Sequence, residues 1–146
     1  IGLKTAEQIK KTLSDAMYDE DNEEEGDDIL YVYGRNVITG LPSERGVSKD
    51  TIYEAIKQFF DDITDSIKNL LERTPPELSA DIIDTGIFLT GGSSSIKNLD
   101  KLIAKETDLK VNTVENAEDS VIRGISIIMS DSRYRKLMYE PRESSF

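Results

Sequence analysis

The chain carries a short apolar strand that runs into two consecutive glycines and then into an amphipathic helix. The strand is predicted over 86–90, the turn is Gly91-Gly92 followed by three serines, and the helix is predicted over 96–106. Glycines let a backbone approach a neighbour closely, and the first N–H groups of a helix have no partner within that helix. Because a helix start carries about half a positive charge, the arrangement favours anionic or polar ligand groups. An ordinary turn with a serine N-cap has the same pattern.

A single long helix is predicted to begin at Ser48 and to end before Pro75-Pro76. Ser48 is a suitable N-cap, and the apolar residues that follow recur at helical spacing and form one continuous stripe. Pro76 is expected to open only a short turn through Ala80. The stripe residues are Ile52, Ile56, Phe59, Phe60, Ile63, Ile67, Leu70 and Leu71.

The second half of the chain has the element order of an α/β layer. After the long helix come the strand and helix described above, a strand over 109–114, a helix over 117–129 and a charged tail. Strands that alternate with helices in this way are typical of a layer with a parallel strand pair.

The first half of the chain is predicted to contain a helix and two strands. The helix covers 5–17, with Thr5 and Gln8 as a capping box. A strand follows over 29–33, and a tight turn leads into a second strand over 37–39. Pro42 is expected to end regular pairing, which leaves the next residues as loop or edge strand.

Composition excludes several classes of function. The chain has no Cys and no His, which removes disulfides, thiolate nucleophiles, Ser-His-Asp catalysis and most zinc sites. The net charge of −11 and the lack of a basic face argue against nucleic acid, and no apolar run is long enough to span a membrane.

Eight of the ten residues over 19–28 are acidic. A calcium loop built on them would need Glu where Val32 stands, so a solvated loop is the better interpretation.

Two further motifs have both a functional and an ordinary interpretation. Asp84-Thr85-Gly86 matches the aspartic-protease signature, but those proteases are almost entirely β, so we interpret it as a polar lead-in to the following strand. The basic and aromatic residues over 133–139 have two interpretations. They could contact anionic lipid or a partner protein, or they could form a frayed C-terminal helix. The chain begins at Ile1 and is expected to be a piece of a longer protein.

Five blocks resemble the MreB family of bacterial actin-like cell-shape proteins. They are residues 5–10 (TAEQIK), 34–42 (GRNVITGLP), 74–82 (TPPELSADI), 86–92 (GIFLTGG) and 99–102 (LDKL). The resemblance implies an α/β fold that is the second half, domain II, of the actin-like fold shared with Hsp70 and sugar kinases.

The resemblance also implies how this half is organised. Residues 1–53, with the acidic loop 19–28, would be the small outer α+β lobe. Residues 54–129 would be the large inner lobe, a mixed sheet flanked by helices. Residues 130–146 would be a charged C-terminal tail.

In the family the nucleotide lies in a cleft between two such halves. A Gly-Gly turn contacts the adenosine, and a helix with Ile-Lys-x-Glu contacts base and ribose. The resemblance maps the turn onto Gly91, Gly92 and Ser93, and the helix contacts onto Lys10 and Thr12. The family has Gly in place of Ser93 and Glu in place of Thr12. A Thr hydroxyl reaches less far than a carboxylate and accepts weaker hydrogen bonds from ribose.

The implied function is that of an ATP-binding, filament-forming cytoskeletal protein that determines cell shape by organising cell-wall synthesis. ATP or ADP with Mg would bind the whole protein, a slow ATPase, whereas no residue of this chain is assigned to catalysis or to metal. The implied partners are further copies, head to tail, and a RodZ-like membrane protein, without nucleic acid and without membrane insertion by this half. The whole protein would be cytoplasmic and membrane-associated. Two alternatives stay open: a divergent interaction module without nucleotide binding, and a fragment of a sugar kinase or Hsp70-type ATPase.

Overall fold

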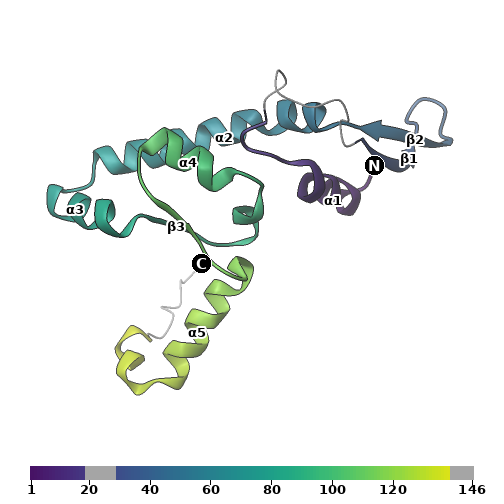
Figure 1. The fold of residues 1–146 in the computed structure, drawn as a ribbon. Helices are drawn as coiled ribbons and strands as arrows, with labels where there is room; N and C mark the ends of the chain where they lie inside the picture. Colours follow the sequence, from purple (N-terminus) through teal and green to yellow (C-terminus); the bar gives the residue numbers. More distant parts are fainter. Residues whose placement is uncertain (19–28, 139–146) are drawn as a thin grey trace, which may run out of the picture.

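A long central helix joins two small sheets in the computed structural model, which describes residues 1–18 and 29–138. The helix α2 (Lys49–Glu72) runs along most of the molecule, with one sheet near its N-terminal end and the other beside its C-terminal half (Figure 1). The side chain of Ser48 accepts a hydrogen bond from the backbone N–H of Thr51 at 3.3 Å, which confirms the predicted cap. The predicted acidic loop, with its calcium alternative, lies outside the described residues, and so do residues 139–146.

The first core lies between α1 (Leu3–Leu13) and an antiparallel hairpin of β1 (Leu30–Arg35) and β2 (Pro42–Val47). Helix α1 starts at Leu3 with Gly2 as its N-cap and has no side-chain cap, so the predicted capping box at Thr5 and Gln8 is wrong. The buried residues of this core are Ile9 and Leu13 on α1 and Val32 on β1. Leu30, Val47 and Ile52 pack around them.

The second strand of the hairpin begins at Pro42, not at residue 37 as predicted. The side chain of Asn36 accepts hydrogen bonds from the backbone N–H groups of Ile38 (2.9 Å) and Thr39 (3.0 Å). These bonds hold residues 37–39 in a turn and leave the following residues to pair with β1. Pro42 is tolerated because it is the first residue of its strand.

The second core lies where α2 packs on a parallel strand pair and its connecting helix. Strand β3 (Ile87–Leu89) pairs in parallel with β4 (Val111–Thr113), and α4 (Leu99–Thr107) connects them, which confirms the predicted parallel pair. The sheet of this region is this pair alone among the described strands, rather than the larger mixed sheet expected. The buried members of the core are Ala16, Phe60, Leu99 and Ile103. Lys68 on α2 also forms an ion pair with Glu106 on α4 at 2.6 Å.

Helix α3 (Pro76–Thr85) is longer than the short turn predicted to start at Pro76. It includes Asp84 and Thr85, so these residues end a helix and are not a polar lead-in to the strand. Gly86 follows with a φ of +79°, and a Cβ at this position would collide with the carbonyl oxygen of Lys110. Only glycine fits here, because both the backbone conformation and the close approach exclude a side chain.

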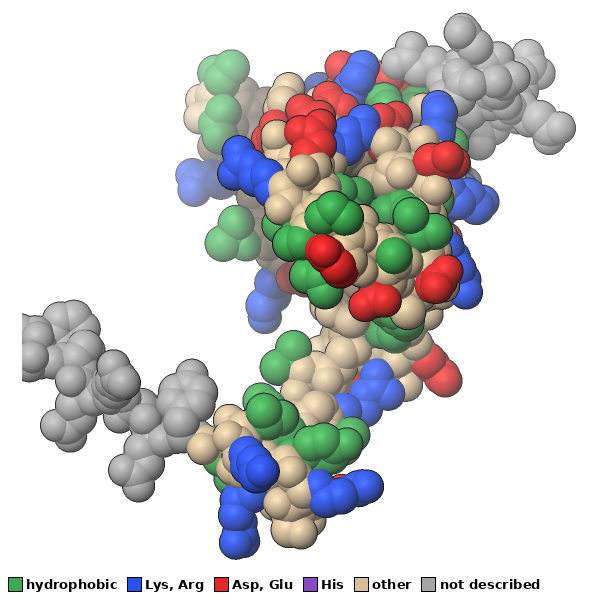
Figure 2. Space-filling model, turned by 90° about the vertical axis from the view of Figure 1, so that its left-hand side faces the viewer, with side chains coloured by type: hydrophobic (Ala, Val, Ile, Leu, Met, Phe, Trp, Pro, Cys, Tyr) green, Lys and Arg blue, Asp and Glu red, His purple; other side chains and the backbone are tan. Residues whose placement is uncertain are grey.

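The C-terminal helices project away from the rest of the molecule (Figure 1). The predicted helix 117–129 is divided into a 3₁₀ turn, η3 (Ala117–Asp119), and α5 (Ser120–Ser130), and a second 3₁₀ helix, η4 (Ser132–Leu137), follows. Apolar residues of α5 are exposed, as in Val121 (70 %) and Met129 (72 %). Figure 2 shows apolar and basic side chains gathered on this lower part of the molecule.

A buried carboxylate connects the segment after α1 to the segment before α4. Asp15 is 7 % exposed and accepts hydrogen bonds from the side chain of Asn98 (2.7 Å) and the backbone N–H of Met17 (3.1 Å). Its second oxygen forms an ion pair with Lys97 at 2.9 Å, and the backbone N–H of Ala16 donates to the Lys97 carbonyl at 2.8 Å. Burial raises the pKa of the Asp15 carboxyl, but the bonds from Asn98, Lys97 and Met17 outweigh it, so the pKa is lowered.

We expect the contribution of Asp15 to stability to depend on pH. Because its pKa is lower in the folded than in the unfolded chain, this contribution is complete above about pH 5 and is lost as the pH falls through the folded value. Asp15→Ala leaves buried donors without an acceptor and should lower the free energy of unfolding at pH 7 by about 2 kcal/mol. Urea unfolding of wild type and variant at pH 7 and at low pH measures the loss of stability and its dependence on pH. A stability gap between wild type and variant that stays constant down to about pH 2 would contradict the assignment.

The collision at Gly86 predicts that Gly86→Ala lowers the free energy of unfolding by more than about 1 kcal/mol. Gly124→Ala is the matched control, because a Cβ at Gly124 meets nothing within 4 Å. The control should leave stability unchanged or raise it slightly, since Ala is the better helix former. Equal stability of the two variants in urea unfolding would show that a side chain is accommodated at Gly86, which contradicts the close approach.

Candidate functional site

The Gly-Gly turn leaves strand β3 and enters a 3₁₀ helix. Gly91 has a φ of +83°, and its N–H donates to the Ala117 carbonyl at 2.9 Å. The next element, η2 (Gly92–Ser95), has only four residues, and α4 begins later, at Leu99, so the turn does not open directly onto the predicted α-helix. The hydroxyls of Ser94 and Ser95 donate to the carbonyls of Gly91 (2.7 Å) and Gly92 (2.6 Å), which favours this tight conformation.

A cavity of about 360 Å³ lies between α1 and η2. Helix α1 and its C-cap contribute side chains at i, i+3, i+4 and i+7, which lie on one face of the helix. These side chains are Glu7, Lys10, Lys11 and Ser14. The opposite wall is formed by η2 with Gly92 and Ser93, whose backbone N–H groups have no acceptor among the residues that the structure describes.

The structure brings most of the predicted site residues together but not all of them. Lys10, Gly92 and Ser93 line the cavity between α1 and η2. Gly91 lines an adjacent cavity of about 330 Å³ on the other side of the turn. Thr12 lines neither of these cavities, and its hydroxyl donates to the Gln8 carbonyl on its own helix at 2.9 Å. It follows Lys10 by two residues and is therefore about 200° away around the helix.

Two acidic residues of the cavity were missed by sequence reasoning. Glu7 precedes Lys10 by one helical turn, so helical spacing could have found it. Glu118 comes from η3, and no local pattern points from there to α1.

The charges of the cavity are divided between its walls. The ammonium group of Lys11 forms an ion pair with Glu7 at 3.2 Å, whereas Lys10 has no ion-pair partner in the described ranges. Free N–H groups and ammonium groups suit a ligand rich in oxygen acceptors. No group of three acidic side chains in the described part of the chain could hold a metal ion.

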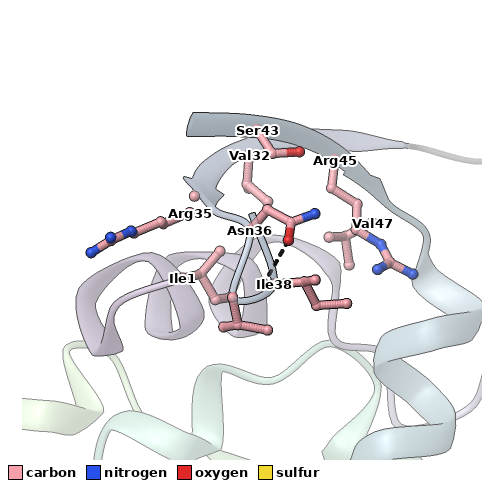
Figure 3. A pocket seen from close by; sticks show the side chains of 10 residues that line it. Ile1, Val32, Arg35, Asn36, Ile38, Ser43, Arg45 and Val47 are labelled. Atoms are coloured by element: carbon pink, nitrogen blue, oxygen red, sulfur yellow. Dashed lines mark hydrogen bonds between the residues drawn. The ribbon is translucent and has the colours of Figure 1, made fainter. Parts of the chain in front are cut away.

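A larger cavity of about 460 Å³ lies under the hairpin, away from the predicted site residues. Figure 3 shows Ile1 and Ile38 beneath Val32 and Val47, with Arg35 and Arg45 at the sides. The cavity is mainly apolar and holds none of the residues predicted to bind a ligand. None of the described helices combines the length and the apolar character needed to cross a membrane.

Comparisons with known proteins give the same family over most of the chain. The family model "MreB/Mbl protein" matches residues 1–136. The cell shape-determining protein Mbl of Bacillus subtilis (strain 168) is 37 % identical over 131 residues, which cover 90 % of this chain and 38 % of that protein. The cell shape-determining protein MreB of Escherichia coli (strain K12) is 36 % identical over 126 residues, 85 % of this chain and 34 % of its own length. The chain thus spans little more than a third of these relatives.

Two crystal structures of a further relative have the same fold. MreB5 of Spiroplasma citri bound to ADP superposes with a TM-score of 0.79 at 32 % identity, over 94 % of this chain and 40 % of that one. The same protein bound to AMPPNP gives a TM-score of 0.78 over 39 % of its length. The family model and the relatives exclude the alternative that the chain is a fragment of a sugar kinase or of an Hsp70-type ATPase. The chain belongs to the MreB/Mbl family, and its fold is part of the actin-like fold of that family.

Proposed function

We propose that this chain supplies the adenosine side of the nucleotide cleft in an ATP-binding, filament-forming cytoskeletal protein that determines cell shape by organising cell-wall synthesis. The observation that carries the proposal is the shared cavity, because Lys10 on α1 and Gly92 with Ser93 in η2 line it from opposite sides. The ADP and AMPPNP complexes of the Spiroplasma relative support a nucleotide as the ligand. The names of the curated relatives support a role in cell shape.

The two cores support a division of the chain into two lobes. The first core includes Ile52 at the start of α2, and the second includes Phe60 with Tyr53, Ile56 and Ile67 farther along this helix. Ala16, from the segment after α1, also packs in the second core. Residues 1–53 would then form the small outer lobe and residues 54–129 the large inner lobe, with 130–146 as a tail. In this arrangement α2 contributes residues to both cores.

The whole protein would bind ATP or ADP with Mg and hydrolyse ATP slowly. Phosphoryl transfer needs groups that hold the phosphates and the metal, and the rest of the family's length would supply them. Head-to-tail contacts between copies generate open filaments rather than closed rings. The filament would be cytoplasmic and membrane-associated, with a RodZ-like membrane protein as a partner, and the exposed apolar face of α5 supports a contact with further protein surface.

A second candidate is an interaction module of the same family that has lost nucleotide binding. The position of Thr12 favours it, because this residue lies outside the cavity and bonds to its own helix. Ser93 also stands in the turn at the position of a family glycine. ATP titration and filament pelleting, with and without nucleotide, separate the two candidates. Filaments that form without measurable nucleotide affinity would identify the interaction module.

Gly92→Val should weaken ATP binding to the complete gene product by about tenfold, because the new side chain enters the cavity. A Cβ at Gly92 meets nothing within 4 Å, so the fold should tolerate the change. Gly2→Val is the matched control, because a Cβ there also meets nothing and Gly2 is not part of the cavity. Titration calorimetry measures the affinities. Equal affinities of the two variants would show that the turn does not contact the nucleotide.

Lys10 and Thr12 should differ in their effect on nucleotide affinity. Lys10→Ala removes a charged donor from the cavity and should weaken ATP binding by about tenfold. Thr12→Ala should leave the affinity within about twofold, because its hydroxyl is bonded to Gln8 outside the cavity. The same titration tests both variants. A larger loss for Thr12→Ala than for Lys10→Ala would contradict the orientation of α1.

A further inference from the structure

Glu118 lies at the junction of the two cavities that flank the Gly-Gly turn. One cavity is bounded by α1 and η2, and the other by η2 and the segment that follows β4. Gly92, Ser95 and Glu118 line both of them. A ligand that occupies either side of the turn therefore comes near the Glu118 side chain.

The backbone around Glu118 is fixed against the turn. The N–H of Gly91 donates to the carbonyl of Ala117 at 2.9 Å, directly before Glu118. On the other side, the guanidinium of Arg123 donates to the carbonyls of Glu115 (2.6 Å) and Asn116 (3.0 Å). Because these bonds hold the η3 backbone from both sides, the position of Glu118 relative to the cavity does not depend on its own side chain.

The carboxylate of Glu118 has no ion pair or hydrogen bond with any residue that the structure describes, whereas Glu7, on α1, is paired with Lys11. An ionised carboxylate only accepts hydrogen bonds, so its ligand must present a donor. On the α1 wall, Lys10 has no ion-pair partner in the described ranges and is a donor for oxygen acceptors, whereas Lys11 is paired with Glu7. The groups of a nucleotide that can donate to this carboxylate are the amino group of the base and the hydroxyls of the ribose.

We propose that Glu118 recognises the base of the nucleotide by accepting a hydrogen bond from the 6-amino group of adenine. The inference rests on the proposed function, since it assigns a specificity-determining residue to the same cavity. A base with a carbonyl oxygen at this position would face the carboxylate with a second acceptor and would be rejected. Glu118 therefore selects adenine by its amino donor, independently of the contacts to ribose and phosphate.

The experiment compares three ligands by titration calorimetry of the complete gene product. They are ATP, purine riboside triphosphate, which lacks the 6-amino group, and 2′-deoxy-ATP. The wild type should bind ATP about tenfold more tightly than purine riboside triphosphate. In Glu118→Ala this ratio should fall to about one, and in Glu118→Gln, which keeps an acceptor oxygen, it should be intermediate. The ratio of the affinities for ATP and for 2′-deoxy-ATP should be the same in all variants.

Glu115→Ala is the matched control, because it removes the same charge three residues earlier from a side chain that lines neither cavity. It should retain the wild-type ratio. A Glu118→Ala variant that keeps the preference for ATP over purine riboside triphosphate would overturn the proposal. A Glu118→Ala variant that instead loses the preference for ATP over 2′-deoxy-ATP would assign Glu118 to the ribose. That result would also overturn the proposal. A wild type that binds no ATP would reject the proposed function first, and this inference with it.

Discussion

The buried carboxylate of Asp15 holds the two halves of the chain in the arrangement on which the candidate site depends. Its bonds to Asn98 and Lys97 join the segment after α1 to the segment before α4. The cavity walls lie next to this junction in the sequence, because one wall ends at Ser14 and the other at Ile96. The backbone bond from the Ala16 N–H to the Lys97 carbonyl and the burial of Ala16 in the second core join the same two segments. The buried carboxylate and these backbone and apolar contacts together hold the two walls of the cavity beside each other.

The chemistry of the cavity follows from which backbone and side-chain groups remain unpaired. The serine hydroxyls of η2 are satisfied within the turn, which leaves the N–H groups of Gly92 and Ser93 for a ligand. The α1 wall offers Lys10 as a donor, and Glu118 offers an acceptor on the opposite side. These groups suit the polar edges of a nucleoside.

Sequence reasoning predicted the elements whose signals are local. The Ser48 cap and the parallel pair were correct because capping and alternation depend on neighbouring residues. The hairpin register was wrong because the β-branched pair Val37-Ile38 has strand propensity, whereas the Asn36 side chain holds it in a turn. The family motif suggested Thr12, although the helical period places it away from Lys10. Glu118 could not be predicted, because only tertiary structure brings η3 to α1.

A crystal structure of the complete gene product with ADP tests the central claim most directly. We expect the adenosine to lie between α1 and η2, with Lys10 and the backbone of Gly92 and Ser93 in contact with it. Adenosine bound anywhere else, for instance in the apolar cavity under the hairpin, would contradict the account.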